Sequence, residues 1–129
     1  MKDFLDKMRK INGGQEDDLI EIIEKLKDTD DGLKLLAACS VYAIDVYNIE
    51  ENLEDWYREY FEWNRKKQEK LFNYMLQETL NLPKNEFIVD YFSEALDYLE
   101  LDYDEEILKE TIENLDKDNL PVLADILSE

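Results

Sequence analysis

Residues 33–47 read LKLLAACSVYAIDVY, and apolar side chains fall on nearly every side of a helix drawn through them. A helix that is apolar all round is buried, because other elements must cover each of its sides. Two aspartates precede this stretch, and Asp is a favoured residue at helix N-caps. We therefore predict a buried central helix over about Leu33–Tyr47, capped by Asp30 or Asp31.

The sequence on either side of this stretch favours an all-α protein. The chain has only three Gly and two Pro in 129 residues, and strict alternation of apolar and polar residues is rare in it. Upstream, one short helix should end at Gly13-Gly14 and a second near Asp28-Thr29. We predict a single all-α domain of six or seven helices over residues 1–129.

The longest periodic segment covers residues 49–80, between a capping signal at Asn48 and a break at Pro83. Polar residues interrupt its pattern from Asn64 to Gln68. We predict one long helix rather than two helices that meet near Asn64, because no Gly or Pro marks a turn there. The first half carries an apolar stripe at helical spacing, formed by Ile49, Leu53, Trp56, Tyr60 and Trp63.

The C-terminal third of the sequence predicts three shorter helices. The second of them should begin after Asp104. The third should begin around Asp118 or Asn119, with Pro121 in its first turn. The first, capped by Asn85, shows the i, i+3, i+4 spacing of an amphipathic helix at Ile88, Tyr91, Phe92, Ala95, Leu96 and Leu99.

The net charge is strongly negative and unevenly distributed along the chain. The 34 acidic and 15 basic residues give a formal charge of −19 at pH 7. Residues 83–129 hold fifteen of the acidic and three of the basic residues, which amounts to twelve of the nineteen net charges. One side or end of the protein should therefore be strongly negative and attract basic partners.

Helical spacing arranges these acidic residues as ridges opposite the apolar faces. Like charges three or four residues apart on a helix each cost about 0.2–0.5 kcal/mol, and few nearby bases compensate for them. A partner that supplies Lys and Arg would relieve this repulsion. We predict partner-binding ridges at Glu86, Asp90, Glu94 and Asp97 on one helix and at Glu106, Glu110 and Glu113 on the next.

The residue types that the chain lacks exclude several chemistries. Without His it has no His-dependent triad, no His-ligated metal site and no unperturbed imidazole base. Its only cysteine, Cys39, can form neither an internal disulfide nor a zinc cluster, and its apolar surroundings predict a core residue. We therefore predict no catalytic residue, no metal and no cofactor.

The composition and charge of the chain also predict its cellular location and its partners. The chain has no signal-peptide stretch, and its longest uncharged run, Leu35–Ile44, is shorter than the ~18–20 residues of a membrane span. A lone cysteine suits a reducing compartment, so the expected location is cytoplasmic. The negative surface repels phosphates, so neither nucleic acid nor a membrane is expected as a direct partner. The sequence does not indicate an oligomeric state.

One acidic motif suggests an enzymatic alternative. Glu50-Glu51-Asn52-Leu53-Glu54 resembles the first acidic motif of the all-α nucleotide pyrophosphohydrolases of the MazG and dimeric dUTPase type. The resemblance implies that an EExxE helix and an ExxD helix hold Mg²⁺ against the phosphates of a nucleotide. The matching ExxD is Glu94-Ala95-Leu96-Asp97, which lies farther along the chain than in that family.

Aromatic residues suggest a further alternative. Five of them lie within eight residues of the predicted long helix, and Tyr57 and Phe61 sit beside the main stripe. We interpret both stripes as core, since large aromatics dominate protein interiors. The alternative is an exposed aromatic surface, including Tyr57 and Phe61, that would make the protein a helical adaptor or assembly protein.

Together these observations predict a non-enzymatic acidic protein that binds and blocks a basic protein surface. Grooves lined with Lys and Arg are typical of nucleases and other nucleic-acid-binding effectors, and an acidic ridge can occupy such a groove in place of phosphates. The expected classes are a toxin immunity protein and a phage-type anti-defence antagonist, such as an anti-CRISPR protein, that mimics nucleic acid. The sequence does not separate these classes.

Overall fold

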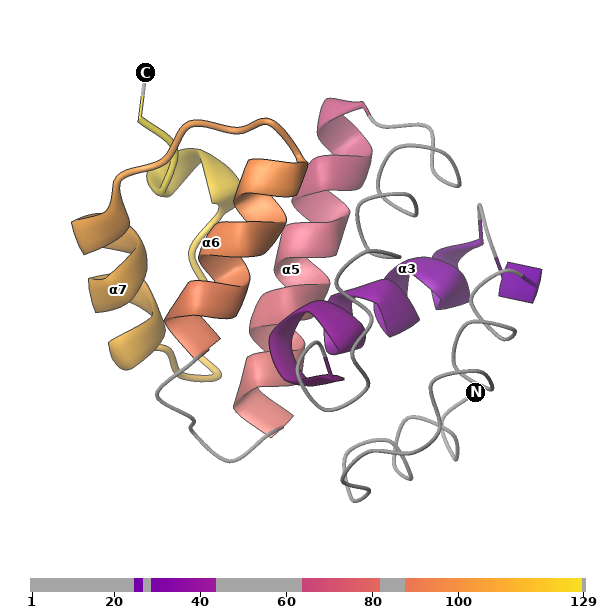
Figure 1. Ribbon diagram of the computed structural model, residues 1–129. Coiled ribbons are helices and arrows are strands. Elements are labelled where there is room, and N and C mark those ends of the chain that lie inside the picture. The colour runs from indigo at the N-terminus through magenta and orange to yellow at the C-terminus, as the bar shows by residue number, and fades with distance from the viewer. Residues whose placement is uncertain (1–24, 27–28, 44–63, 82–87, 129) are drawn as a thin grey trace.

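The structure is a computed structural model that describes residues 25–26, 29–43, 64–81 and 88–128, and every structural statement below refers to these residues (Figure 1). They form α3 (Asp30–Ala38), the π-helical turn η1 (Cys39–Ala43), α5 (Arg65–Asn81), α6 (Ile88–Tyr98), α7 (Glu105–Glu113) and the 3₁₀ turn η3 (Leu123–Asp125). The described part contains isolated β-bridges but no strand. The prediction of an all-α fold is confirmed, while the number of helices depends partly on residues outside the described ones.

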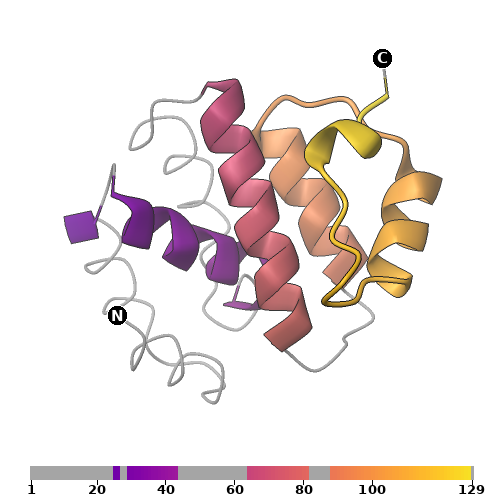
Figure 2. The same cartoon turned by 180° about the vertical axis from the view of Figure 1, so that it is seen from behind.

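The helices follow one another across the molecule in the order α7, α6, α5, α3 (Figure 1). Seen from behind, the C-terminal segment with η3 lies in front of α6, between α5 and α7 (Figure 2). The turn η1 lies on the opposite side and contacts both α5 and α6. The paired helices α5 and α6 are thus covered from both sides, and the core forms around them.

The predicted central helix is buried as far as the structure describes its side chains. Residues 35–41 of α3 and η1 are all buried, and Lys34 is the one exposed residue between Gly32 and Val41. A π turn replaces the regular helix from Cys39 onward. The burial predicted for Leu33–Tyr47 is therefore confirmed through Val41, with Lys34 as the exception, whereas the central place predicted for this helix is not confirmed, because α3 lies at one end of the order of helices (Figure 1). Residues 44–47 lie outside the described residues.

The predicted cap of this helix is wrong by one residue. Thr29, rather than Asp30 or Asp31, is the N-cap, and its side chain accepts a hydrogen bond from the Gly32 amide at 3.0 Å. Thr29 also binds the preceding segment, because its own amide donates to the Leu26 carbonyl at 3.0 Å. The two aspartates occupy the first turn instead, where their negative charge favours the helix N-terminus.

The single helix predicted for residues 49–80 is also wrong, because α5 begins only at Arg65. The Asn64 side chain accepts a hydrogen bond from the Lys67 amide at 2.9 Å, as an N-cap does, and the Asn64 carbonyl accepts from Gln68 at 3.0 Å. An asparagine can therefore start a helix where no Gly or Pro marks a turn. Residues 49–63, with the aromatic stripes, lie outside the described residues.

Helix α6 confirms its predicted apolar face, whose six residues are all buried. Phe92 of this face meets Phe72 of α5 edge to face, with ring centroids 5.9 Å apart. The helix ends where Glu100 takes a left-handed conformation with a φ of 59°. Hydrogen bonds from Leu101 to Leu96 and from Glu100 to Asp97 complete a Schellman turn, which redirects the chain toward α7.

The start of α7 was predicted correctly, but the last predicted helix is wrong. Asp104 caps α7, and its carboxylate accepts hydrogen bonds from the amides of the second and third residues of that helix. The helix expected from Asp118 or Asn119 is reduced to the single turn η3, with Pro121 outside it. The physical reason is a competing turn, in which the Asp116 side chain accepts from the Asp118 amide at 2.9 Å.

Candidate functional site

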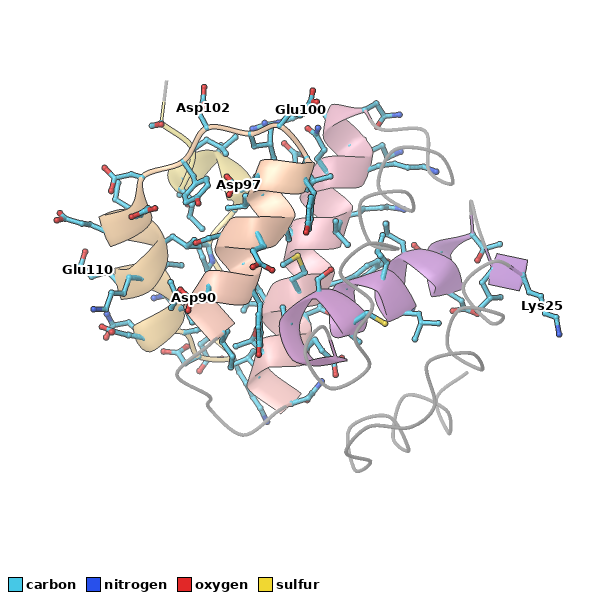
Figure 3. The ribbon with its side chains drawn as sticks, in the orientation of Figure 1. Lys25, Asp90, Asp97, Glu100, Asp102 and Glu110 are labelled. Carbon is cyan, nitrogen blue, oxygen red and sulfur yellow. The ribbon has the colours of Figure 1, made fainter. Side chains whose placement is uncertain are left out.

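The acidic face of the molecule is formed by α6, α7 and the segments after them. The described residues 88–128 contain thirteen acidic side chains, every one of them exposed, and only two lysines. Figure 3 shows Asp90 and Asp97 on α6, Glu100 and Asp102 on the connection to α7, and Glu110 on α7, whereas Lys25 lies at the opposite end. This half of the molecule therefore carries most of the negative charge of the described residues.

A groove of about 460 Å³ lies between α6 and α7 within this face. On the α6 side it is lined by Val89, Asp90, Ser93, Glu94 and Asp97. Tyr103, Glu105 and Lys109 complete the lining from the connecting segment and from α7. Four carboxylates thus meet one lysine in a concave surface, which suits the binding of cationic side chains.

Tyr103 brings a phenol ring into this groove. The segment that carries it is paired with the C-terminus: Tyr103 forms a bridge with Leu127, and the Asp104 amide donates to the Ile126 carbonyl at 3.2 Å. Burial raises the pKa of Tyr103, and the carboxylates of Asp97 and Glu105 raise it further, against a lowering hydrogen bond with Ser93. The phenol therefore stays neutral at physiological pH and can donate a hydrogen bond or stack on a cation.

The structure separates the predicted ridge residues into two groups. Asp90, Glu94 and Asp97 line the groove, as their spacing on one helix face predicts. The three predicted α7 residues, Glu106, Glu110 and Glu113, are exposed, but none of them lines the groove. Glu86, Tyr57 and Phe61 lie outside the described residues, so their part in a site stays a prediction.

Sequence reasoning missed the groove residues that α7 contributes. Glu105 and Lys109 are four residues apart and therefore share a face of α7, a spacing that was available in the sequence. The predicted ridge of Glu106, Glu110 and Glu113 lies on a different side of the same helix. Only the packing of α7 against α6 shows which of these two sides of α7 lines the groove.

The described residues offer no metal centre. No group of three or more Asp, Glu or Cys side chains among them is arranged to hold a metal ion. Of the two motifs that suggest the pyrophosphohydrolase alternative, Glu94 and Asp97 are exposed residues of the groove, and Glu50–Glu54 lies outside the described residues.

The enzymatic alternative has a direct test. We expect the purified chain to release no pyrophosphate or phosphate from a panel of nucleoside triphosphates in the presence of Mg²⁺ or Mn²⁺, because the groove presents a single lysine to hold their phosphates. Turnover that disappears in both Glu51→Gln and Glu94→Gln would establish the pyrophosphohydrolase instead. Turnover that is unchanged in both variants would come from a contaminating enzyme.

Cys39 lies in the core, as the sequence predicts. It has no exposed surface, and burial raises the pKa of its thiol far above the ordinary range, with the nearby Glu78 carboxylate raising it further. The thiolate needed for nucleophilic chemistry is therefore absent at physiological pH.

Comparisons with known proteins do not assign this chain to a class, so its function must be argued from its own residues. No protein-family model matches the chain, and no curated protein or solved structure is significantly similar to it. Among the described residues, no helix combines the length and apolar character required to cross a membrane.

Proposed function

We propose that this chain is a non-enzymatic inhibitor that binds and blocks a basic surface of another protein, namely a nuclease or another nucleic-acid-binding effector. The observation that carries the proposal is the charge of residues 88–128, which comprise α6, α7 and the segments after each of them: thirteen exposed acidic residues are accompanied there by two lysines. A surface of one sign on this scale raises association rates with oppositely charged partners by about 10- to 1,000-fold.

The groove adds a binding geometry to this electrostatic attraction. Its carboxylates come from both α6 and α7, and a Lys or Arg side chain entering between the helices would meet charge from two sides. A substrate groove of a nuclease presents such side chains toward phosphates. Carboxylates arranged along a helix can replace those phosphates, which keeps the nucleic acid out while the complex lasts.

A toxin immunity protein and a phage-type antagonist of a defence nuclease, including an anti-CRISPR protein, both need this surface. Under the proposal, a protein of either class would cover the nucleic-acid site of its effector. The proposal therefore names the chemistry of the target, a Lys/Arg-lined groove, which both classes share.

The experiment that tests the proposal compares two baits in an extract of the cells in which the chain is naturally expressed. One bait is the wild-type chain, and the other carries Asp90→Asn, Glu94→Gln and Asp97→Asn, which keep similar shapes and remove the charges. We expect a basic protein to be retained by the wild type alone and, once purified, to lose nuclease or nucleic-acid-binding activity when one equivalent of the chain is added. A partner retained equally by both baits, or one that remains active in the complex, would contradict the proposal.

A further inference from the structure

The acidic groove between α6 and α7 contains an aromatic ring in addition to its carboxylates. Tyr103 reaches the groove from the segment that connects the two helices, and Val89 contributes an aliphatic side chain from α6. Both residues pack against the core and stay partly exposed. The groove therefore offers apolar as well as charged surface to a ligand.

The ring of Tyr103 is restrained from two directions. Its backbone pairs with the C-terminal segment through the bridge with Leu127. Its hydroxyl interacts with Ser93 and with the Asp97 carboxylate, which both lie on α6 and line the groove. A ring that is restrained on both sides loses little conformational freedom when a ligand stacks on it, so the entropic cost of the contact is small.

The carboxylates of the groove are not paired with basic side chains of the described part of the chain. Lys109 lines the same groove. No ion pair among the described residues, however, includes Asp90, Asp97 or Glu105. The two aspartates belong to α6 and Glu105 to α7, so carboxylates stand on both walls. A cationic side chain that enters between the helices would therefore meet acceptors on either side.

The lining favours the guanidinium group of arginine over the ammonium group of lysine. A guanidinium is planar and stacks on the face of an aromatic ring, and it is more weakly hydrated than an ammonium, so it enters partly apolar surroundings at lower cost. Its five N–H donors can reach several carboxylates at once, whereas lysine presents a compact point charge. Tyr103 supplies the ring, and the two walls supply the carboxylates.

We infer that the acidic groove binds an arginine side chain of the partner, stacked on Tyr103 and hydrogen-bonded to carboxylates of both helices, an assignment that rests on the proposed function. The groove volume of about 460 Å³ lies within the ~300–1,000 Å³ of ligand sites, which leaves room for a guanidinium and its aliphatic stem. Arginine is also a residue of choice for contacts with phosphates, so the nucleic-acid groove of an effector supplies such side chains.

The test is a titration of the ¹⁵N-labelled full chain with two capped tripeptides, glycine-arginine-glycine and glycine-lysine-glycine, at low ionic strength. We expect saturable shifts for backbone amides near Ser93 and Glu105. The arginine peptide should bind roughly two- to fivefold more tightly, which is the factor that an exposed cation–π contact supplies. Equal binding of the two peptides, or no saturable shift with either, would overturn the inference.

Variants of Tyr103 decide whether the ring supplies the preference. Tyr103→Leu removes the ring and should bind both peptides equally, and its binding of the lysine peptide shows that the groove is intact. Tyr103→Phe keeps the ring and should retain the preference for arginine. Tyr98→Leu changes a partly buried tyrosine of α6 outside the groove lining, and this matched control should behave like the wild type. A preference that survives in Tyr103→Leu, or that is lost in Tyr103→Phe, would contradict the role of the ring.

Charge variants locate the binding of both peptides. Asp90→Asn combined with Glu105→Gln should weaken both peptides about threefold or more and leave the preference for arginine, because the carboxylates attract either cation. Glu106→Gln combined with Glu110→Gln removes two charges of α7 outside the groove lining, and this control should stay within about twofold of the wild type. Equal losses in the two variants would mean that the peptides do not bind in the groove.

These measurements use the chain alone, which separates their outcome from that of the bait experiment. Equal binding of the two peptides would refute the arginine preference and leave a basic partner as proposed. Failure to retain a basic protein would refute the proposed function, while the peptide preference would still be measured. Shifts of the same amides that depend on chain concentration without any peptide would show that a second copy occupies the groove, and would overturn the assignment of an arginine from another protein.

Discussion

A chain with Asp90→Lys, Glu94→Lys and Asp97→Lys is expected to associate with its basic partner at least tenfold more slowly than the wild type at low ionic strength. The three side chains line the α6–α7 groove and are exposed, so the variant should keep the fold while the groove changes sign. The loss should grow as salt is removed, because screening is weakest there. Stopped-flow or surface-binding kinetics over a salt series measures it.

Two control variants, each with three charge reversals, are needed to interpret this result. Glu106→Lys, Glu110→Lys and Glu113→Lys reverse the exposed ridge of α7, which lies outside the groove lining. Asp3→Lys, Asp6→Lys and Asp17→Lys change the net charge equally in the N-terminal part of the sequence. We expect the groove variant to lose the most rate. Equal losses in all three would mean that only net charge matters, and no loss in any would point to an apolar contact.

The sequence predicts the features of the fold that depend on residues close together in the chain. Helix α6 shows this most clearly, since the spacing of its apolar residues identified all six buried positions and left Asp90, Glu94 and Asp97 outside. Asp104 was likewise identified as the start of α7, because an acidic cap satisfies the first amides of the helix. Both features depend on residues within a few positions of one another.

Competition between neighbouring caps was harder to predict. Thr29 and Asp30 are both good N-caps, and the choice depends on the Leu26 carbonyl, which the Thr29 amide reaches. Asn64 was read as a polar interruption of a longer helix, although its side chain caps α5. In both places the sequence allows two local solutions, and the spacing of apolar residues does not distinguish them.

The residues of the acidic groove could be assigned to helix faces from the sequence, but the groove itself could not be predicted. The acidic groove needs α7 to fold back against α6, which depends on the left-handed Glu100 and on the pairing of Tyr103 with Leu127. The packing of α3 against α5 is equally non-local, since the Tyr74 hydroxyl donates to Asp30 across 44 positions of sequence. Periodicity assigns residues to the faces of one helix, and it does not show which faces of two helices meet.

Gly32→Ala is expected to destabilise the protein by about 1–3 kcal/mol, as overpacking of a close contact does. An alanine Cβ at this position would lie 2.1 Å from the Leu26 carbonyl oxygen and 2.9 Å from its carbonyl carbon. These are backbone atoms, so no side-chain rotation can relieve the clash. The Leu26 carbonyl also accepts the Thr29 amide, so moving it would disturb the cap of α3.

Gly32→Ala is informative because the expected loss of stability is opposite in sign to the usual effect of this substitution in a helix. In an open helical position, replacing Gly by Ala stabilises a protein by up to about 1 kcal/mol, because Ala has the higher helix propensity. Thermal unfolding should instead show a midpoint lowered by on the order of 4 °C for each kcal/mol lost. Asn73→Ala, at an exposed position of α5, serves as the control and should be neutral or slightly stabilising. A Gly32→Ala variant more stable than the wild type would contradict this expectation and would mean that the Leu26 carbonyl does not lie against the first turn of α3.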